Sequence, residues 1–277
     1  MLERITPLVL TYNEAPNIGR TLGRLTWARD IVVVDSYSDD ETVSLVSKFP
    51  QARVVRREFD SLEGQWNYAL EHTGISTEWV LALDADYVLT PAFVEELGRL
   101  RPAGDVNGYR AAFKYCVYGR PLRGSAYPPV TVLYRRAHAR YRQDGHAHRV
   151  VVSGRVEPLR ESVLHDDRKS VARWLHSQGI YQRQELDKLE AADRSRLGWP
   201  DRVRRRGVFA PFLALFYCLF IRRGILDGKA GLFYAYQRML AETILSTYLL
   251  DRELERSAAG RGPEAESAAP PAGVESV

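Results

Sequence analysis

The sequence predicts an α/β protein built on an open sheet. Short apolar runs rich in β-branched residues recur at residues 7–11, 31–34, 53–55 and 79–83. Helical periodicity fills the stretches between these runs, and this alternation is typical of parallel βαβ units whose strands are buried on both faces. The ligands of such sheets gather beyond the carboxyl ends of the strands. We therefore expect the functional residues of this chain at that edge.

Two helices in this half have clear sequence signals. Pro16 can occupy the first turn of a helix whose Ile18 and Leu22 share one face. Thr90 can cap a second helix that begins at Pro91. Each predicted helix follows a predicted strand, as the βαβ pattern requires.

The pattern changes after the fourth apolar run. Short aromatic or β-branched segments at residues 109–117, 130–134 and 149–152 indicate added strands that are partly antiparallel. A long helix capped by Ser170 follows them. These features predict one mixed α/β domain over residues 1–190.

The composition is that of a globular protein. Of the 277 residues, 45% are hydrophobic and 27% are charged, which excludes wholesale disorder, a collagen and a disulfide scaffold. Cys116 and Cys218 fit no metal-ligand spacing, so we expect a reducing, cytoplasmic setting. The first residues lack the pattern of a secretion signal, and no apolar run reaches the roughly 18 residues of a spanning helix.

Arginine dominates the positive charge. The formal net charge is +4, and 34 of the 39 basic residues are arginines. The planar guanidinium matches phosphate and carboxylate groups. Anionic partners such as nucleotide diphosphates, acidic lipids or nucleic acids therefore fit the composition, although a GC-rich coding sequence would produce the same excess.

The most specific motif is Asp84-Ala85-Asp86, which directly follows the apolar run at residues 79–83. Residues two apart in an extended chain face the same way, so both carboxylates can point at one object. Carboxylate oxygens suit Mg²⁺ or Mn²⁺, and such ions also bind substrate phosphates. The alternative is a polar turn that happens to hold two aspartates.

Polar clusters also follow the first two predicted strands. Thr-Tyr-Asn-Glu stands at residues 11–14, and Val-Asp-Ser-Tyr-Ser-Asp-Asp-Glu-Thr stands at residues 34–42. Together with the later Asp-x-Asp, these motifs resemble the family 2 glycosyltransferases over roughly residues 5–190. The resemblance implies a GT-A type α/β fold, an open mixed sheet with a Rossmann-like nucleotide-binding half.

Later segments narrow the likeness. Residues 143–149 and 165–170 are similar to the branch of lipopolysaccharide inner-core and related cell-envelope transferases. Three positions depart from the commonest family pattern, because Ser36 stands where a second aspartate is usual and Tyr37 and Glu41 stand where glycines are usual. These departures concern the selectivity for the donor base more than catalysis.

The resemblance implies roles for the side chains at the sheet edge. Tyr12 would stack on the nucleobase, Glu14 and Asp35 would line the base and ribose pocket, and Asp86 with Asp84 would hold the metal ion and the diphosphate. The implied nucleotide-sugar site comprises Thr11, Tyr12, Glu14, Asp35, Asn67, Asp84, His146, His148, Arg149 and Arg168. The implied ligands of Mn²⁺ or Mg²⁺ are Asp84, Asp86 and His165.

Several of these residues have structural alternatives. Tyr12 could be an ordinary loop aromatic, and Asp35 or Asn67 could cap a helix. A lone histidine such as His165 is more often a hydrogen-bonded structural residue than a ligand. The histidines at 146 and 148 could hold the diphosphate, orient a neighbouring carboxylate or merely lie in a loop.

An inverting transferase needs a carboxylate that takes the proton from the attacking hydroxyl. Asp144 precedes a glycine in the polar turn where family 2 enzymes usually keep their base, so the resemblance makes it the first candidate. Asp166 and Asp167 are the alternatives.

The carboxy-terminal region predicts a membrane-associating helical appendage over residues 191–256. The apolar run at 208–221 is bracketed by arginines and is too short to span a bilayer, so we expect it to lie in the membrane interface. A buried or dimer-interface helix is the alternative. A final helix is predicted over about 232–250, and the composition of residues 257–277 predicts a disordered tail. The side chains expected in the acyl boundary are Phe209, Phe212, Leu215, Phe216, Leu219 and Phe220.

These observations predict a metal-dependent, inverting glycosyltransferase. It would move a sugar from a nucleotide-diphosphate donor to a lipid-linked or cell-envelope glycan, while bound peripherally to the inner face of the plasma membrane. The alternatives are transfer to a polyprenyl phosphate, which needs no base, and an inactive membrane-bound scaffold with the same fold. The sequence shows no aromatic and basic platform for single strands, so nucleic acid is not an expected partner.

Overall fold

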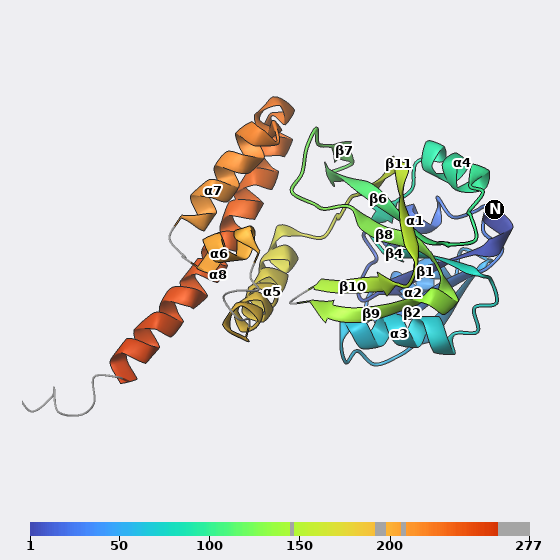
Figure 1. Cartoon of the computed structure of the whole chain (residues 1–277), viewed down its shortest axis with the longest axis horizontal. Helices are drawn as coiled ribbons and strands as arrows, with labels where there is room; N and C mark the ends of the chain where they lie inside the picture. Colours follow the sequence, from blue (N-terminus) through green and yellow to red (C-terminus); the bar gives the residue numbers. More distant parts are fainter. Residues whose placement is uncertain (145–146, 192–197, 206–208, 260–277) are drawn as a thin grey trace, which may run out of the picture.

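A computed structural model describes residues 1–144, 147–191, 198–205 and 209–259 of the chain. Over these residues the chain forms a mixed sheet covered on both faces and a group of helices beside it (Figure 1). Two short 3-10 turns, η1 and η2, precede the first strand and a later one. They comprise Leu2–Arg4 and Arg136–His138.

The first half of the sheet is parallel. Its strands are β1 (Ile5–Thr11), β2 (Ile31–Asp35), β3 (Ala52–Arg56) and β4 (Trp79–Asp84). They lie in the order β3-β2-β1-β4. The predicted runs and their parallel pairing are confirmed, and all four strands end at the same edge of the sheet.

The second half of the sheet is mixed. Its strands are β8 (Val130–Arg135), β6 (Val106–Val117), β11 (Arg155–His165) and β5 (Tyr87–Val88), and they continue the sheet from β4 in that order. β8 is antiparallel to both β4 and β6, β11 is parallel to β6, and the short β5 is antiparallel to β11. A two-residue strand, β7 (Arg120–Pro121), pairs with the end of β6.

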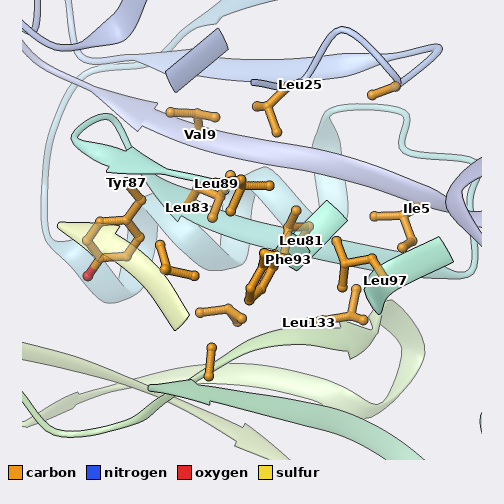
Figure 2. Packing of buried hydrophobic residues seen from close by; sticks show 14 of the residues in the cluster. Ile5, Val9, Leu25, Leu81, Leu83, Tyr87, Leu89, Phe93, Leu97 and Leu133 are labelled. Carbon is orange, nitrogen blue, oxygen red and sulfur yellow. The ribbon is translucent and has the colours of Figure 1, made fainter. Parts of the chain in front are cut away.

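Helices cover both faces of the sheet. They are α1 (Ile18–Leu22), α2 (Thr42–Val46), α3 (Leu62–His72) and α4 (Pro91–Arg99). On one face Val9 and Leu81 pack with Phe93 and Leu97 of α4 (Figure 2). Thr90 caps α4 as predicted, since its hydroxyl accepts a hydrogen bond from the Phe93 amide at 3.1 Å.

The opposite face is covered by α3 and by a hairpin made of β9 (Ala139–Asp144) and β10 (Ala147–Val152). Trp66 of α3 stacks on Tyr141 of β9 with 4.9 Å between the ring centroids. The Tyr141 hydroxyl also bonds that of Tyr134 at 2.9 Å. The hairpin is thereby fixed to the sheet at its base, and Asp144 stands at the end of β9.

The carboxy-terminal helices form their own layer beside the sheet (Figure 1). They are α5 (Val171–Ala191), α6 (Trp199–Arg205), α7 (Ala210–Phe216), the π-helical turn η3 (Tyr217–Ile221), the 3-10 turn η4 (Gly224–Asp227) and α8 (Lys229–Ala259). α5, α6 and α7 all pack against α8. Within the described part of the chain, no helix combines the length and the hydropathy that crossing a membrane needs.

Some elements differ from the sequence-based expectations. The apolar run at 208–221 gives α7 followed by a π-helical turn instead of one regular helix. The last helix runs from Lys229 to Ala259, so residues 257–259 are helical and do not belong to the predicted tail. Leu215 and Leu219, which we expected to face lipid, pack inward beside Cys218 and α8.

Candidate active site

The loops that follow β1 and β2 are joined through Asp35. This carboxylate is fully buried and accepts hydrogen bonds from the hydroxyls of Thr11 at 2.9 Å and Ser38 at 2.6 Å, and from the Ser38 amide at 2.9 Å. The Ser38 hydroxyl in turn accepts a hydrogen bond from the Asn13 amide at 2.8 Å. Thr11 and Asp35, both predicted site residues, therefore shape the two loops from within.

Tyr12 lies on the surface of this loop pair. Its side chain is 54% exposed, and the backbone beyond it turns sharply, because Asn13 adopts a left-handed φ of 56°. Arg173 of α5 donates to the carbonyl oxygens of Tyr12 at 2.9 Å and Asn13 at 2.8 Å. The ring of Tyr12 is thus presented to solvent on a backbone that is held in place.

The Asp-x-Asp motif brings a carboxylate to a histidine at the end of β4. Asp86 Oδ2 lies 3.1 Å from His165 Nε2, and both side chains are largely buried. Burial alone would raise the pKa of Asp86, but His165 and Lys169 lower it below its ordinary value. Burial would lower the pKa of His165, but Asp86, followed by Asp84, raises it. Asp86 and His165 are therefore in direct contact, and Asp84 adds to the negative charge around the imidazole.

Tyrosine rings enclose His165. The rings of Tyr87, Tyr115 and Tyr127 meet the imidazole edge to face, with centroid distances of 5.3, 5.0 and 4.9 Å. The hydroxyls of Tyr87 and Tyr127 bond each other. This cage restricts the orientation of the imidazole, and Asp86 is the charged residue that hydrogen-bonds to the ring.

The Asp86 and His165 pair fits a divalent cation in part. Asp86 Oδ1 and His165 Nδ1 are buried, and neither atom has a hydrogen-bond partner among the described residues. Carboxylate oxygen and imidazole nitrogen together suit Mn²⁺. Within the described residues, however, no three His, Cys, Asp or Glu side chains gather into a ready metal site. Asp86 and His165 could therefore supply at most two side-chain ligands, and a cation bound there would need further ligands from substrate phosphates or water.

A second pair of charged groups interacts electrostatically with Asp86. Glu14 Oε1 is 2.6 Å from Lys169 Nζ, and Glu14 Oε2 accepts a hydrogen bond from Asn17 at 2.8 Å. Burial, opposed by Lys169 and helped by Asp86, raises the pKa of Glu14 to about 7. Burial lowers the pKa of Lys169, but the carboxylates of Glu14, Asp167 and Asp86 raise it above its ordinary value, so this cation stays protonated.

Asp166 is occupied by cations. Its carboxylate lies 2.6 Å from Arg20 Nη1 and 2.9 Å from Arg168 Nη2, and it accepts a hydrogen bond from the Gly119 amide at 2.9 Å. Burial would raise the pKa of Asp166, but the hydrogen bonds from Arg168 and Gly119 and the charge of Arg20 lower it. Arg168 is thereby committed to Asp166.

Asp167 faces a different neighbourhood from Asp166. Its Oδ1 accepts hydrogen bonds from Asn17 Nδ2 at 2.9 Å and from the Lys169 amide at 3.0 Å. The residue also lines a small pocket between the end of β6 and the carboxy-terminal helices, together with Tyr115, Lys169 and Trp174. Asp167 therefore borders the space next to the His165 cage.

The remaining predicted residues lie elsewhere or outside the description. The amide of Asn67 exchanges two hydrogen bonds with the backbone of Tyr141, at 2.9 and 3.1 Å, and so joins α3 to β9. Arg149 is an exposed residue of β10. His146 and the side chains of Asp144 and His148 lie outside the described residues.

Sequence reasoning missed several residues that build the site. Asn17, Arg20 and Arg173 each contact a residue far away in the chain, and the Asn17 to Asp167 hydrogen bond joins positions 150 residues apart. Local spacing carries no signal for such pairs. The tyrosine cage likewise comes from separate strands and a loop. Lys169 was not missed, since the sequence already groups it with Arg149 and Arg168 as a cation for the leaving diphosphate.

The family model for "Glycosyl transferase family 2" matches residues 8–162, which contain the ends of β1, β2 and β4. The chain belongs to this family. The matched range includes the polar residues of this family 2 glycosyltransferase that follow β1, β2 and β4 at one edge of the sheet.

Proteins with similar sequences are named as glycosyltransferases. The lipopolysaccharide core biosynthesis glycosyltransferase LpsC of Rhizobium meliloti is 32% identical over 176 residues, which cover 58% of this chain and 62% of that protein. An uncharacterized glycosyltransferase of Rickettsia conorii is 29% identical over 112 residues, or 40% of this chain and 39% of the relative. The chain thus spans less than two thirds of the length of these relatives.

A solved structure shows the same fold. The mannosyltransferase PcManGT from Pyrobaculum calidifontis, in complex with GDP-Man and Mn²⁺, superposes with a TM-score of 0.51 at 17% identity, over 93% of this chain and 88% of that one. The likeness confirms the predicted GT-A type fold of this family 2 member.

Proposed function

We propose that the chain is a metal-dependent, inverting glycosyltransferase that moves a sugar from a nucleotide-diphosphate donor to a hydroxyl group of a lipid-linked or cell-envelope glycan. The observation that carries this proposal is the buried Asp86 and His165 pair at the end of β4, with an unpartnered atom on each residue. Family membership supports the reaction class, and the LpsC relative supports a glycan acceptor of the lipopolysaccharide core type.

The nucleoside would lie over the loops after β1 and β2. The exposed ring of Tyr12 offers a flat apolar face for a base, and it stands on a backbone fixed by Arg173. Asp35 is consumed by bonds within the protein, so its proposed role is to hold these loops, with Thr11 as its partner.

The diphosphate would lie beside Asp86. Asp86 and His165 would hold the cation, with Asp84 near enough to add negative charge, and phosphate oxygens and water would fill the other positions. When bound, such an ion stabilises negative charge on the departing diphosphate. Lys169 is a permanent cation near the same place, and we propose that it neutralises Glu14 and Asp167 so that the anionic donor can approach.

Asp144 and Asp167 are the proposed candidates for the base. Asp166 is bound to Arg20, Arg168 and the Gly119 amide, so we assign it to positioning the segment that carries His165. Asp167 borders the pocket beside Tyr115, where an acceptor hydroxyl could approach. Asp144 ends β9, at the tip of the hairpin.

Nucleotide release with and without acceptor tests the proposal. Purified protein with Mn²⁺ would be given a panel of nucleotide sugars, alone and with membrane extract. We expect Asp86→Ala to lower the rate by at least about 100-fold, because the ion that would stabilise the departing diphosphate loses its buried carboxylate ligand. Asp251→Ala, at an exposed position of α8, is the matched control. Equal release by Asp86→Ala and the unchanged chain would refute the metal site.

A second comparison identifies the base. Asp144→Asn and Asp167→Asn would be assayed for transfer over a range of donor concentrations at saturating acceptor. We expect one of them to lose at least about 100-fold in kcat with an unchanged donor KM, since a base acts on the acceptor and not on donor binding. Full turnover in both variants would favour an acceptor that is already anionic, such as a polyprenyl phosphate.

A further inference from the structure

Large apolar side chains cover the outer face of the segment from α7 to η4. Their exposed fractions run from 41% at Tyr217 to 69% at Phe209, values typical of surface residues. Monomeric soluble proteins rarely expose large contiguous apolar patches, so a series of exposed apolar side chains at neighbouring positions needs an explanation. The outer apolar face comprises Phe209, Phe212, Leu213, Phe216, Tyr217, Phe220, Ile221, Ile225 and Leu226.

The segment from α7 to η4 is apolar on both its inner and its outer side. Its inner side packs on Tyr234 and Ala235 of α8 through Cys218, Leu215 and Leu219. The outer side carries the aromatic residues, with the phenylalanines of positions 209, 212, 216 and 220 spaced three or four residues apart so that they form one stripe. A helix whose larger apolar groups face outward is not explained by the core of its own chain.

Arginines flank this face in the sequence, although Arg204 is already paired with Glu242 at 2.8 Å. Between Asp201 and Asp227 the sequence contains six arginines and no acidic residue. At the tip, Arg222 lies over the Tyr217 ring at 5.9 Å, and Arg223 is exposed. Arg223 adopts a left-handed φ of 58°, which turns the chain sharply between η3 and η4. Cations therefore border the apolar residues on the side where the chain turns back.

We propose that the outer apolar face docks on the surface of an anionic lipid bilayer, with its aromatic and aliphatic side chains in the acyl boundary and with Arg222 and Arg223 at the head groups. Aromatic stripes flanked by basic residues bind such interfaces through apolar burial and charge attraction together. A second copy of the chain fits less well, because pairing this face with itself would bring like charges together. The inference deepens the proposed function by naming the surface on which the acceptor is met.

The docking face is tied to the candidate site. Asp227 accepts a hydrogen bond from the Arg123 amide at 3.0 Å, and the Tyr234 hydroxyl accepts one from the Ala126 amide at 2.9 Å. The next residue, Tyr127, is part of the cage around His165. The loop between β7 and β8 therefore links the two places, and docking would fix the height and tilt of the candidate site above the bilayer.

Vesicle flotation of the full chain tests the inference. We expect the chain to float with vesicles that contain phosphatidylglycerol and phosphatidylcholine, and to bind phosphatidylcholine vesicles at least about tenfold less. The double change Phe212→Ser with Phe216→Ser should lower binding to anionic vesicles at least about tenfold. Leu254→Ser, an equally exposed apolar residue near the end of α8, is the matched control and should bind normally.

Four results would overturn the docking assignment. The first is that the unchanged chain does not float with the vesicles, and the second is that the double variant binds them as well as the unchanged chain. The third is complete release in about 1 M NaCl, because charge would then be the sole contact. The fourth is a stable dimer that the double change dissociates. Unfolding midpoints check that the variants fold. Nucleotide release without acceptor is measured in parallel, and the double variant should keep it, so a failure of docking is distinguishable from a failure of the proposed reaction.

Discussion

The carboxyl edge of the sheet buries charged side chains, whereas the outer face of α7 exposes apolar ones. At the sheet edge, charged groups such as Asp35, Asp86 and Asp166 are buried, and each has bonding partners within the protein. On α7, phenylalanines such as Phe212 are exposed, and the described residues supply nothing that covers them. The first arrangement serves a site that the chain builds for itself, whereas the second points to a partner outside the chain.

The largest expected effect contrasts an ordinary core residue with the outer apolar face. Leu81 is fully buried, so Leu81→Ala should lower the free energy of unfolding by about 3 kcal/mol. Phe212 is 63% exposed, so Phe212→Ala should change it by less than about 0.5 kcal/mol. Urea unfolding measures both. A comparable loss in the two variants would show that Phe212 packs in solution and would break the comparison.

The second prediction concerns the buried charges. Asp166→Asn should lower the free energy of unfolding by about 2 kcal/mol, because two arginines lose their carboxylate while remaining partly exposed to water. Asp30→Asn is the matched control, since its pair with Arg53 is considerably more exposed and should contribute less than about 1 kcal/mol. Equal losses in chemical unfolding would mean that burial adds nothing to the Asp166 contacts.

A smaller effect is expected where the two regions meet. Asp227→Ala leaves the Arg123 amide without its acceptor, so the free energy of unfolding should fall by about 1 to 2 kcal/mol. The loop that carries Tyr127 should also become more open, which hydrogen exchange at residues 123–127 would report. Unchanged exchange in that loop would contradict the link between the helices and the His165 cage.

The smallest effect lies at the rim of the site and depends on pH. Asp40 accepts hydrogen bonds from the amides of Thr42 at 2.9 Å and Ala15 at 3.1 Å. Although burial would raise the pKa of Asp40, the hydrogen bond from the Thr42 hydroxyl and those from the two amides lower it. A carboxyl with a lowered pKa in the folded state stabilises the fold above its unfolded pKa and loses this contribution as the pH falls.

Asp40→Ala should therefore lower the free energy of unfolding by less than about 1 kcal/mol at neutral pH, because solvent screens this exposed carboxylate, and the difference from the unchanged chain should shrink below about pH 4. Thermal unfolding across the acid range measures it. A difference that is constant with pH would show that the side chain acts through packing and not through its charge.

The parallel half of the sheet was predictable from the sequence. Its strands are buried on both faces, so they appear as continuous apolar runs, and β1, β2, β3 and β4 all lie where those runs predict. β11 was missed, because it contains Pro158 and alternates apolar with charged residues, and its pairing with β6 is interrupted after Pro158. A half-exposed strand of this kind resembles a loop in composition.

Site residues were predictable only where they belong to a short motif in the sequence. The neighbourhood of Asp84, Asp86 and His165 follows from the resemblance and from strand ends that meet at one edge. The partners of Asp166 could not be predicted, because Arg20 lies 146 residues away. On α7, composition indicated an interfacial segment, but it could not say that Leu215 packs inward, since that depends on where α8 lies.

Residues 165–169 connect parts of the molecule that lie far apart in the sequence. Within five consecutive positions this segment reaches Asp86 after β4, Gly119 after β6, and Asn17 and Glu14 after β1. The side chains in this segment contact different partners, so inserting or deleting a single residue would place the wrong side chain opposite each partner. Length changes should therefore be tolerated in the loops around this stretch and rejected within it, whatever substitutions accumulate there.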